Sequence, residues 1–229
     1  MTNFVLIHGA FQGGWIWKLV AARLRDAGHV VYHPTLDGCG ERAYQLRPGI
    51  TTETQAEEMA GFLWSEDLND VVLVGSSAGG MVTAKTAELA RDRISRLVFA
   101  DALALMHGES IRDIVSGRQS IETDVAVGPT RDDRYGRFIK DMDKDLAAWA
   151  ADRSTVHPKG CFFDPVVLEN FWDQKWEATV VWCKQAGKPG EPHQRRAAET
   201  LGAKWIELDT GHYAMLSEPD ALTHIIVEG

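Results

Sequence analysis

Residues 71–81 of this chain read VVLVGSSAGGM. The β-branched run at the start predicts a buried strand, and a helix-compatible run follows from residue 81 to residue 89. Between them, residues 75–79 match the pattern G-x-S-x-G, which is typical of a sharp strand–turn–helix that exposes a nucleophilic serine. We therefore expect a strained backbone at Ser77 and a hydroxyl at the N-terminus of a helix. The alternative is a glycine-rich turn with a chance serine, which the strand and helix context disfavours.

The rest of the chain alternates between strand and helix patterns. Short apolar runs predict further strands at residues 4–7, 29–33, 96–100, 179–183 and 204–208. Helical periodicity appears at residues 15–27, 52–66, 194–201 and 219–227. About six strands alternating with helices are typical of a mostly parallel sheet covered on both faces. The predicted fold class is therefore α/β, with residues 1–229 forming a single domain.

Residues 102–175 differ in character from the rest. They are rich in charge, contain scattered glycine and proline and show no clear strand periodicity, and they predict a mostly helical insertion with helices near residues 109–116, 132–152 and 165–171. The insertion leaves from the C-terminal end of a strand, the edge of open α/β sheets where ligands bind. This position favours a lid over the alternative, a structural layer unrelated to substrate.

A serine hydroxyl needs a base to remove its proton during attack. On such a scaffold the base follows the last strand, and His212 lies in a glycine-containing loop just after that strand. We assign His212 as the base. Less well-placed alternatives, any of which fits an ordinary surface or core position, are His8, His29, His107, His157 and His224.

The acid that orients the base is less clear from the sequence. The loop after the next-to-last strand, residues 184–191, contains no aspartate, and its Glu191 comes late. Asp101 directly follows the strand after the serine, from which a carboxylate would reach the far side of His212 and fix its tautomer. We assign Asp101 and keep Glu191 as the alternative.

The oxyanion hole requires two backbone N–H groups. One comes from Ala78, after the serine, and the other from the loop after the first strand, where Ala10 is the expected donor. Phe11, Met106 and Trp172 are candidates for an apolar substrate pocket, with ordinary packing as the alternative for each.

Composition limits the partners. The formal net charge of −9 argues against nucleic acid and anionic membranes. Three cysteines without metal-ligand spacing indicate reduced thiols, and no signal peptide or membrane-length apolar run is evident, so we expect a cytoplasmic protein. We expect a monomer or homodimer that needs no metal or cofactor and takes a small, apolar or aromatic substrate.

Four stretches together carry a family resemblance. They are residues 5–15 (VLIHGAFQGGW), 72–80 (VLVGSSAGG), 97–102 (LVFADA) and 208–212 (LDTGH). Here the chain resembles α/β-hydrolase-fold proteins, in the short branch of plant methylesterases, hydroxynitrile lyases and bacterial esterases. The resemblance covers roughly residues 3–101 and 176–227, and bacterial relatives of this kind carry the acid at the position of Asp101. Residue 76 is serine where many relatives carry histidine, which makes Ser76 a further candidate for substrate binding.

Together, these features predict a cofactor-free serine hydrolase that cleaves a small carboxylic ester, carbamate, lactone or activated amide through an acyl-enzyme. The first alternative is a hydroxynitrile lyase that uses the same triad as a general base. Such lyases resemble one another in a threonine where this chain has Gly9 and a lysine where it has Tyr213, which ranks the lyase lower. A non-catalytic binding protein is a further alternative, and nucleotide binding is disfavoured because residues 9–14 fit neither dinucleotide nor P-loop pattern.

Overall fold

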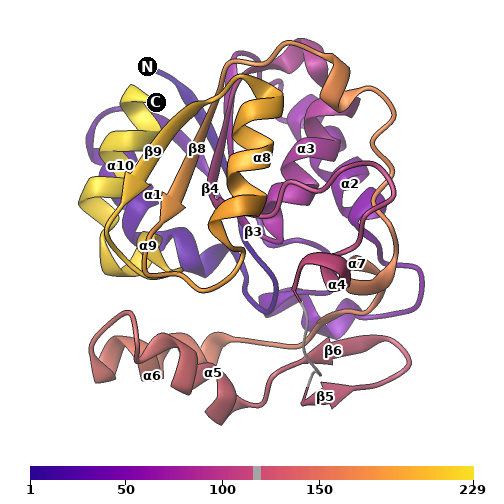
Figure 1. Ribbon diagram of the computed structural model, residues 1–229, viewed down its shortest axis with the longest axis vertical. Coiled ribbons are helices and arrows are strands. Elements are labelled where there is room, and N and C mark those ends of the chain that lie inside the picture. The colour runs from indigo at the N-terminus through magenta and orange to yellow at the C-terminus, as the bar shows by residue number, and fades with distance from the viewer. Residues whose placement is uncertain (116–119) are drawn as a thin grey trace.

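Six parallel strands form the central sheet of the computed structural model, which describes residues 1–115 and 120–229 (Figure 1). Their order across the sheet is β2-β1-β3-β4-β8-β9. The strands are β1 (Asn3–Ile7), β2 (Val30–Tyr32), β3 (Val71–Ser77), β4 (Ile94–Ala102), β8 (Ala178–Cys183) and β9 (Lys204–Leu208). Each predicted strand is present, within a few residues of its predicted ends.

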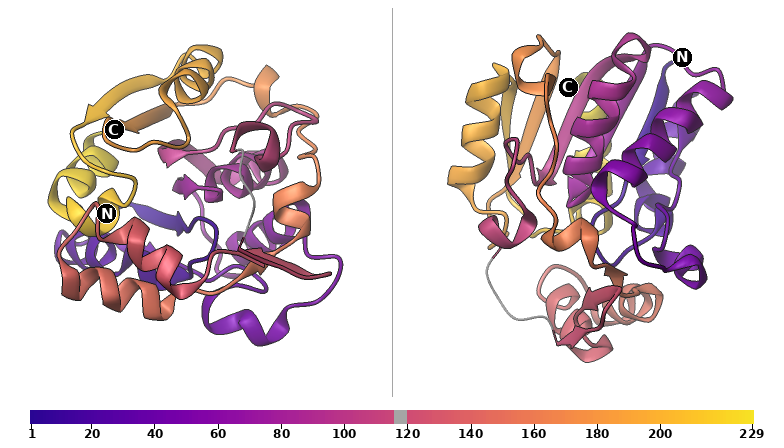
Figure 2. Two further views of the ribbon diagram at one scale, coloured as in Figure 1. Left: turned by 60° about the horizontal axis from the view of Figure 1, so that its bottom comes forward. Right: turned by 90° about the vertical axis from the view of Figure 1, so that its right-hand side faces the viewer.

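Helices cover both faces of this sheet (Figures 1 and 2). One face carries α1 (Lys18–Asp26), α9 (Ala214–Ser217) and α10 (Pro219–Glu228); the other carries α2 (Thr52–Ser65), α3 (Gly79–Leu89) and α8 (Glu191–Leu201). Alternate residues of a strand enter two separate cores: Val5 and Ile7 pack on the second face, whereas Phe4 and Leu6 pack on the first. This burial on both sides explains the uninterrupted apolar runs.

The insertion after β4 forms a layer across the C-terminal edge of the sheet, away from both chain termini (Figures 1 and 2). It contains a helical hairpin of α5 (Arg131–Phe138) and α6 (Lys144–Arg153) beside a small antiparallel sheet of β5 (Ile121–Glu122), β6 (Ala126–Gly128) and β7 (His157–Pro158). Shorter elements are α4 (Ile111–Ile114), α7 (Gly160–Phe163) and the 3-10 turns η1 (Gly14–Trp17), η2 (Gly40–Gln45), η3 (Arg91–Arg93) and η4 (Phe171–Asp173).

The sequence predicted this insertion less well than the sheet. The single helix expected over residues 132–152 is two helices, because Asp143 accepts hydrogen bonds from the Asp145 and Leu146 amides and starts α6 anew. The helix expected at residues 165–171 is wrong, since only the turn η4 forms there. The helix expected at 109–116 is limited to α4, and Ser116 lies outside the described residues. None of the described helices is long and apolar enough to span a bilayer.

Candidate active site

The backbone at Ser77 has the conformation expected of a nucleophile turn. Ser77 ends β3 with φ of 50°, in the left-handed region that non-glycine residues seldom adopt, and α3 begins two residues later. The pairing of β3 with β4 shifts register between Ser76 and Ser77. Such backbone strain persists where surrounding structure enforces it, and it gathers at functional sites.

Asp101 and His212 form a close side-chain pair. Oδ2 of Asp101 lies 2.5 Å from Nδ1 of His212. Asp101 sits near the end of β4, also with a left-handed φ of 46°, and its side chain is 1% exposed. His212 follows β9, so the contact passes the end of β8, which lies between these strands. Because Nδ1 faces the carboxylate, Nε2 is left for a second partner.

The other carboxylate oxygen of Asp101 is also engaged. Oδ1 accepts hydrogen bonds from the Cys183 amide at 3.2 Å and from Nε2 of Gln194 at 2.7 Å. Gln194 is itself held because its Nε2 also donates to the Pro189 carbonyl at 3.0 Å. These donors stabilise a buried carboxylate in one orientation.

The loop after β1 packs directly on Ser77. A Cβ on Gly9 would lie 2.6 Å from Cβ of Ser77, so this close approach requires glycine. The Gly9 amide donates to Oε1 of Gln12 at 3.1 Å, which closes the loop around Ala10. Phe11 has φ of 69° and is a third strained residue at the site. We refer to residues 8–12 as the oxyanion loop.

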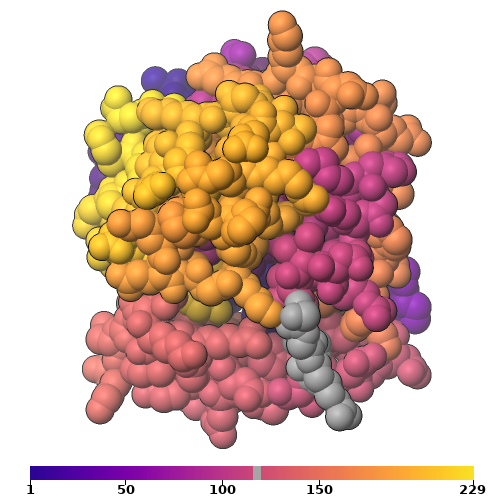
Figure 3. Space-filling model, viewed as in Figure 1, coloured from indigo at the N-terminus to yellow at the C-terminus, as the bar shows by residue number. Residues whose placement is uncertain are grey.

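A cavity of about 640 Å³ opens beside Ser77 and His212. The space-filling view shows a hollow between the insertion and the segment above it (Figure 3). Apolar side chains line one part of it: Phe11, Leu103, Ile111, Val115 and Phe162. Charged side chains line another part: Arg137, Lys140, Asp141 and Lys188. Within residues 1–115 and 120–229, neither Arg137 nor Lys140 forms an ion pair.

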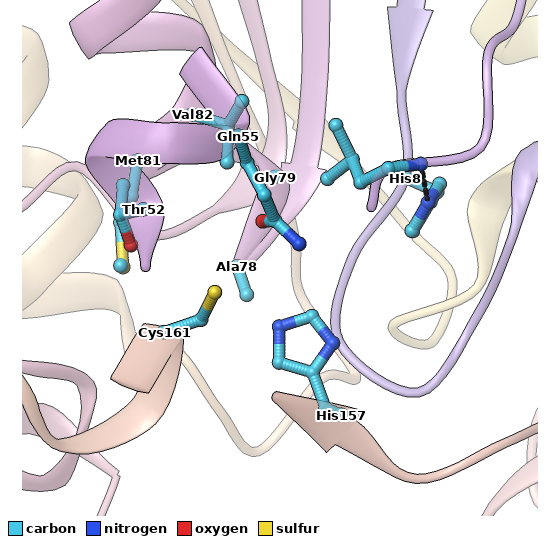
Figure 4. Close-up of a pocket in the computed structure, with 10 residues that line it drawn as sticks. His8, Thr52, Gln55, Ala78, Gly79, Met81, Val82, His157 and Cys161 are labelled. Carbon is cyan, nitrogen blue, oxygen red and sulfur yellow. Dashed lines mark hydrogen bonds between the residues drawn. The ribbon is translucent and has the colours of Figure 1, made fainter. Parts of the chain in front are cut away.

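A second, tightly packed polar cluster lies behind the oxyanion loop (Figure 4). Nδ1 of His8 lies 2.8 Å from the Gly9 carbonyl, and Nε2 accepts from the Leu36 amide, an arrangement that fits the neutral imidazole. Nδ1 of His157, from β7, lies 3.3 Å from Sγ of Cys39. Burial lowers the pKa of His8 to about 4 and of His157 to about 3, and raises the pKa of Cys39 to about 12. The cluster leaves no room for a water molecule.

In residues 1–115 and 120–229, no group of three or more histidine, cysteine or acidic side chains is arranged to hold a metal ion.

The chain was compared with known proteins. The model of the Alpha/beta hydrolase family matches residues 4–225. The chain belongs to this family. Methylesterase 2 of Arabidopsis thaliana is 37% identical over an alignment of 251 positions, which covers 96% of this chain and 93% of that protein. This confirms the resemblance and the α/β-hydrolase fold predicted from the sequence.

Two further similarities are notable. A carbendazim hydrolyzing esterase of Nocardioides sp. (strain SG-4G) is 45% identical over 111 residues, which cover 48% of this chain and less than half, 46%, of the esterase. Among solved structures, an extracellular alpha/beta-hydrolase from a Paenibacillus species, described as sharing structural and functional homology with tobacco salicylic acid binding protein 2, has a TM-score of 0.87 at 24% identity. That alignment covers 100% of this chain and 98% of the other chain.

The structure brings together most of the side chains singled out from the sequence. Ser77, His212, Ala10, Ala78 and Phe11 line the cavity. Asp101 lies behind His212, in hydrogen-bond contact with it. The alternative acid is elsewhere: Oε1 of Glu191 accepts from Arg195 on α8.

Three candidates for substrate binding lie outside the cavity lining, as far as the described residues define it. Ser76 is buried at 1% exposure, because neighbouring residues of a strand face opposite sides of the sheet and Ser77 takes the cavity side. Nε1 of Trp172 donates to the Leu105 carbonyl, and its ring packs on Phe171. The backbone of Met106 is held by Glu109. Trp172 and Met106 are therefore engaged in contacts within the protein that do not involve the cavity.

Sequence reasoning missed three residues at this site. Gln194 holds Asp101. Arg134 and Asp141, both from the insertion, contact the oxyanion loop and the backbone of Tyr213, respectively. Gln194 carries one weak signal, because it is a polar residue at the start of the helix predicted over residues 194–201. Nothing in local sequence pattern marks Arg134 or Asp141, since their partners lie more than 70 residues away.

Proposed function

We propose that this hydrolase cleaves small carboxylic esters or related acyl compounds through an acyl-enzyme on Ser77. The observation that carries the proposal is the 2.5 Å contact between Asp101 and His212 beside a serine held at φ of 50° in the same cavity. Without these two features the fold would support many other functions.

The proposed reaction follows from this arrangement. Ser77 Oγ attacks the carbonyl carbon while Nε2 of His212 takes its proton, and Asp101 stabilises the resulting imidazolium. The backbone N–H groups of Ala10 and Ala78 stabilise the oxyanion. The C–O bond to the alcohol then breaks as His212 returns the proton to the leaving oxygen. A water molecule, deprotonated by His212, finally hydrolyses the acyl-enzyme to the carboxylic acid and free Ser77.

The cavity supports a small, partly apolar or aromatic substrate. Its volume, about 640 Å³, is within the range of small-molecule sites. Phe11 and Phe162, whose ring centroids lie 5.5 Å apart, form an aromatic part of the wall. A carbamate is a reasonable member of the substrate class, because a relative is named as a carbendazim hydrolyzing esterase.

Hydroxynitrile lyase activity is the second candidate. Arg137, Lys140 and Lys188 line the cavity and would offer a cation to a leaving cyanide, although residue 213 is tyrosine where resembled lyases carry lysine. The other departure from the lyases is Gly9, which contacts Ser77 so closely that a side chain has no space in this backbone. We therefore rank the lyase second.

The test combines a serine-directed probe with a substrate panel. A fluorophosphonate is expected to label Ser77; Ser77→Ala abolishes labelling, and Ser76→Ala, at the neighbouring buried serine, keeps it. The panel includes short p-nitrophenyl esters, a carbamate such as carbendazim, a lactone, an amide and mandelonitrile. An unlabelled wild type that turns over none of the acyl compounds would reject the hydrolase, and preferential cleavage of mandelonitrile would favour the lyase.

A further inference from the structure

The α5–α6 hairpin of the insertion touches the two loops that flank Ser77. At one side, Arg134 of α5 donates from Nη1 to the Phe11 carbonyl at 2.8 Å, and its guanidinium lies 4.8 Å from the centre of the Phe11 ring. The Thr155 amide, just after α6, donates to the same carbonyl at 3.0 Å. The strained residue of the oxyanion loop is therefore held from the insertion.

Arg134 is suited to this contact because it is buried and charged. Arg134 is only 5% exposed. Its Nη2 and Nε donate to the carbonyls of Thr155 and Pro129, respectively. Burial lowers the pKa of Arg134 to about 10, so the guanidinium stays protonated at neutral pH. A protonated donor makes stronger hydrogen bonds to carbonyl oxygens than a neutral one.

At the other side, Asp141 in the turn between α5 and α6 contacts the histidine loop, residues 209–213. Its Oδ2 accepts from the Tyr213 amide, directly after His212, at 3.2 Å. A Cβ on Gly211 would lie 2.0 Å from Oδ1 of Asp141, so the carboxylate rests against the bare backbone of the loop. Ring packing of Phe138 on Tyr213, with centroids 4.3 Å apart, adds an apolar contact to the same loop.

We propose that Asp141 is a positioning residue for His212, and that the α5–α6 hairpin aligns the catalytic base with the oxyanion loop. This inference rests on the proposed function. Asp101 fixes the ring of His212 through Nδ1, whereas Asp141 fixes the backbone from which that ring projects. Small displacements of a reacting group cost large factors in rate, so the contact is expected to act on kcat.

Asp143 provides the matched control, because it is an acidic residue two positions away with a purely local role. It caps α6 through hydrogen bonds from the Asp145 and Leu146 amides. We expect Asp141→Ala to lower kcat on a short p-nitrophenyl ester by roughly 10–100-fold. KM is expected to change less than threefold. The kcat of Asp141→Asn, which keeps one acceptor oxygen, is expected to lie between those of the wild type and Asp141→Ala. Asp143→Ala is expected to lower Tm while kcat stays within about twofold of wild type.

Gly211→Ala tests the same contact from the opposite side. The added methyl collides with the Asp141 carboxylate, so kcat is expected to fall, and removal of the carboxylate in Asp141→Ala/Gly211→Ala is expected to restore kcat to the level of Asp141→Ala alone. This rescue distinguishes positioning from a general loss of stability, because two independent losses of stability would add in the double variant.

The outcomes separate the two proposals. Wild-type ester hydrolysis with Asp141→Ala no slower than Asp143→Ala, or with additive effects of the two site changes, would overturn the role of Asp141 and leave the hydrolase intact. A wild type that neither labels with a fluorophosphonate nor hydrolyses an acyl compound would overturn both.

Discussion

Oδ2 of Asp101 and Nδ1 of His212 lie 2.5 Å apart although 111 residues separate them in the sequence. The first is at the end of β4 and the second follows β9, with β8 between them in the sheet. The carboxylate reaches the ring because Asp101 adopts a left-handed φ, and Cys183 and Gln194 hold its remaining oxygen. The contact therefore depends on the tertiary arrangement of the strand ends.

Replacement of this carboxylate tests its assignment as the acid. Asp101→Asn keeps the shape of the side chain but offers His212 an amide, which stabilises the wrong tautomer and no longer stabilises the imidazolium. We expect kcat to fall by roughly 10³–10⁴-fold in steady-state assays. Glu191→Gln, which removes the charge of a side chain that pairs with Arg195 and not with His212, is expected to stay within about twofold. The reverse order of effects would move the acid to Glu191.

Glycine at position 9 is a second point of sensitivity. Gly9→Ala places a methyl group 2.6 Å from Cβ of Ser77, so the loop or the serine must shift. We expect loss of most activity and of fluorophosphonate labelling. Gly61→Ala in α2 is the matched glycine change, because nothing lies within 4 Å of the new methyl. It is expected to raise the free energy of unfolding by roughly 0.5–1 kcal/mol with unchanged turnover.

Acid is expected to destabilise the fold through three buried histidines. Burial lowers the pKa of His8 and of His193 to about 4, and of His157 to about 3, from an ordinary value of 6.5. In the unfolded chain these side chains take up protons as the pH falls below 6.5, whereas in the folded chain they stay neutral until about pH 4. Each therefore costs about 1.4 kcal/mol of stability per pH unit across that window.

Urea denaturation between pH 7 and pH 4.5 measures this slope. His157→Gln, which removes one titrating group beside Cys39, is expected to flatten the curve while lowering stability at pH 7. A free energy of unfolding that stays constant down to pH 4.5 would contradict the prediction.

Arg137 and Lys140 are expected to bias the cavity toward esters that carry a second, anionic group. In a protein of net charge −9 these cations line the cavity without an ion-pair partner among the described residues. Arg137→Glu is expected to lower kcat/KM for a p-nitrophenyl hemisuccinate relative to the butyrate by roughly 3–10-fold. Arg153→Glu alters an insertion cation outside the cavity lining and is the control. An unchanged ratio would show that the substrate does not meet these cations.

The sheet could be predicted from the sequence because each buried strand is a short, continuous run of apolar residues. For the acid, the sequence favours Asp101 but leaves Glu191 open, since both follow strands; the three-dimensional contacts place Asp101 against His212 and Glu191 against Arg195. Ser76 was an avoidable choice, because it alternates with Ser77 along one strand. The strands β5, β6 and β7 are two or three residues long and exist through pairing, as between Val127 and His157, which local periodicity does not register.

The position of Asp101 on β4 also has a consequence for how new specificities are acquired. Residues 185–189 line the cavity, and none of them carries a carboxylate. If the acid were in that loop, changes of its length or sequence would displace the carboxylate from the base. With Asp101 as the acid, libraries that vary residues 185–187 are expected to alter the substrate range with little loss of turnover.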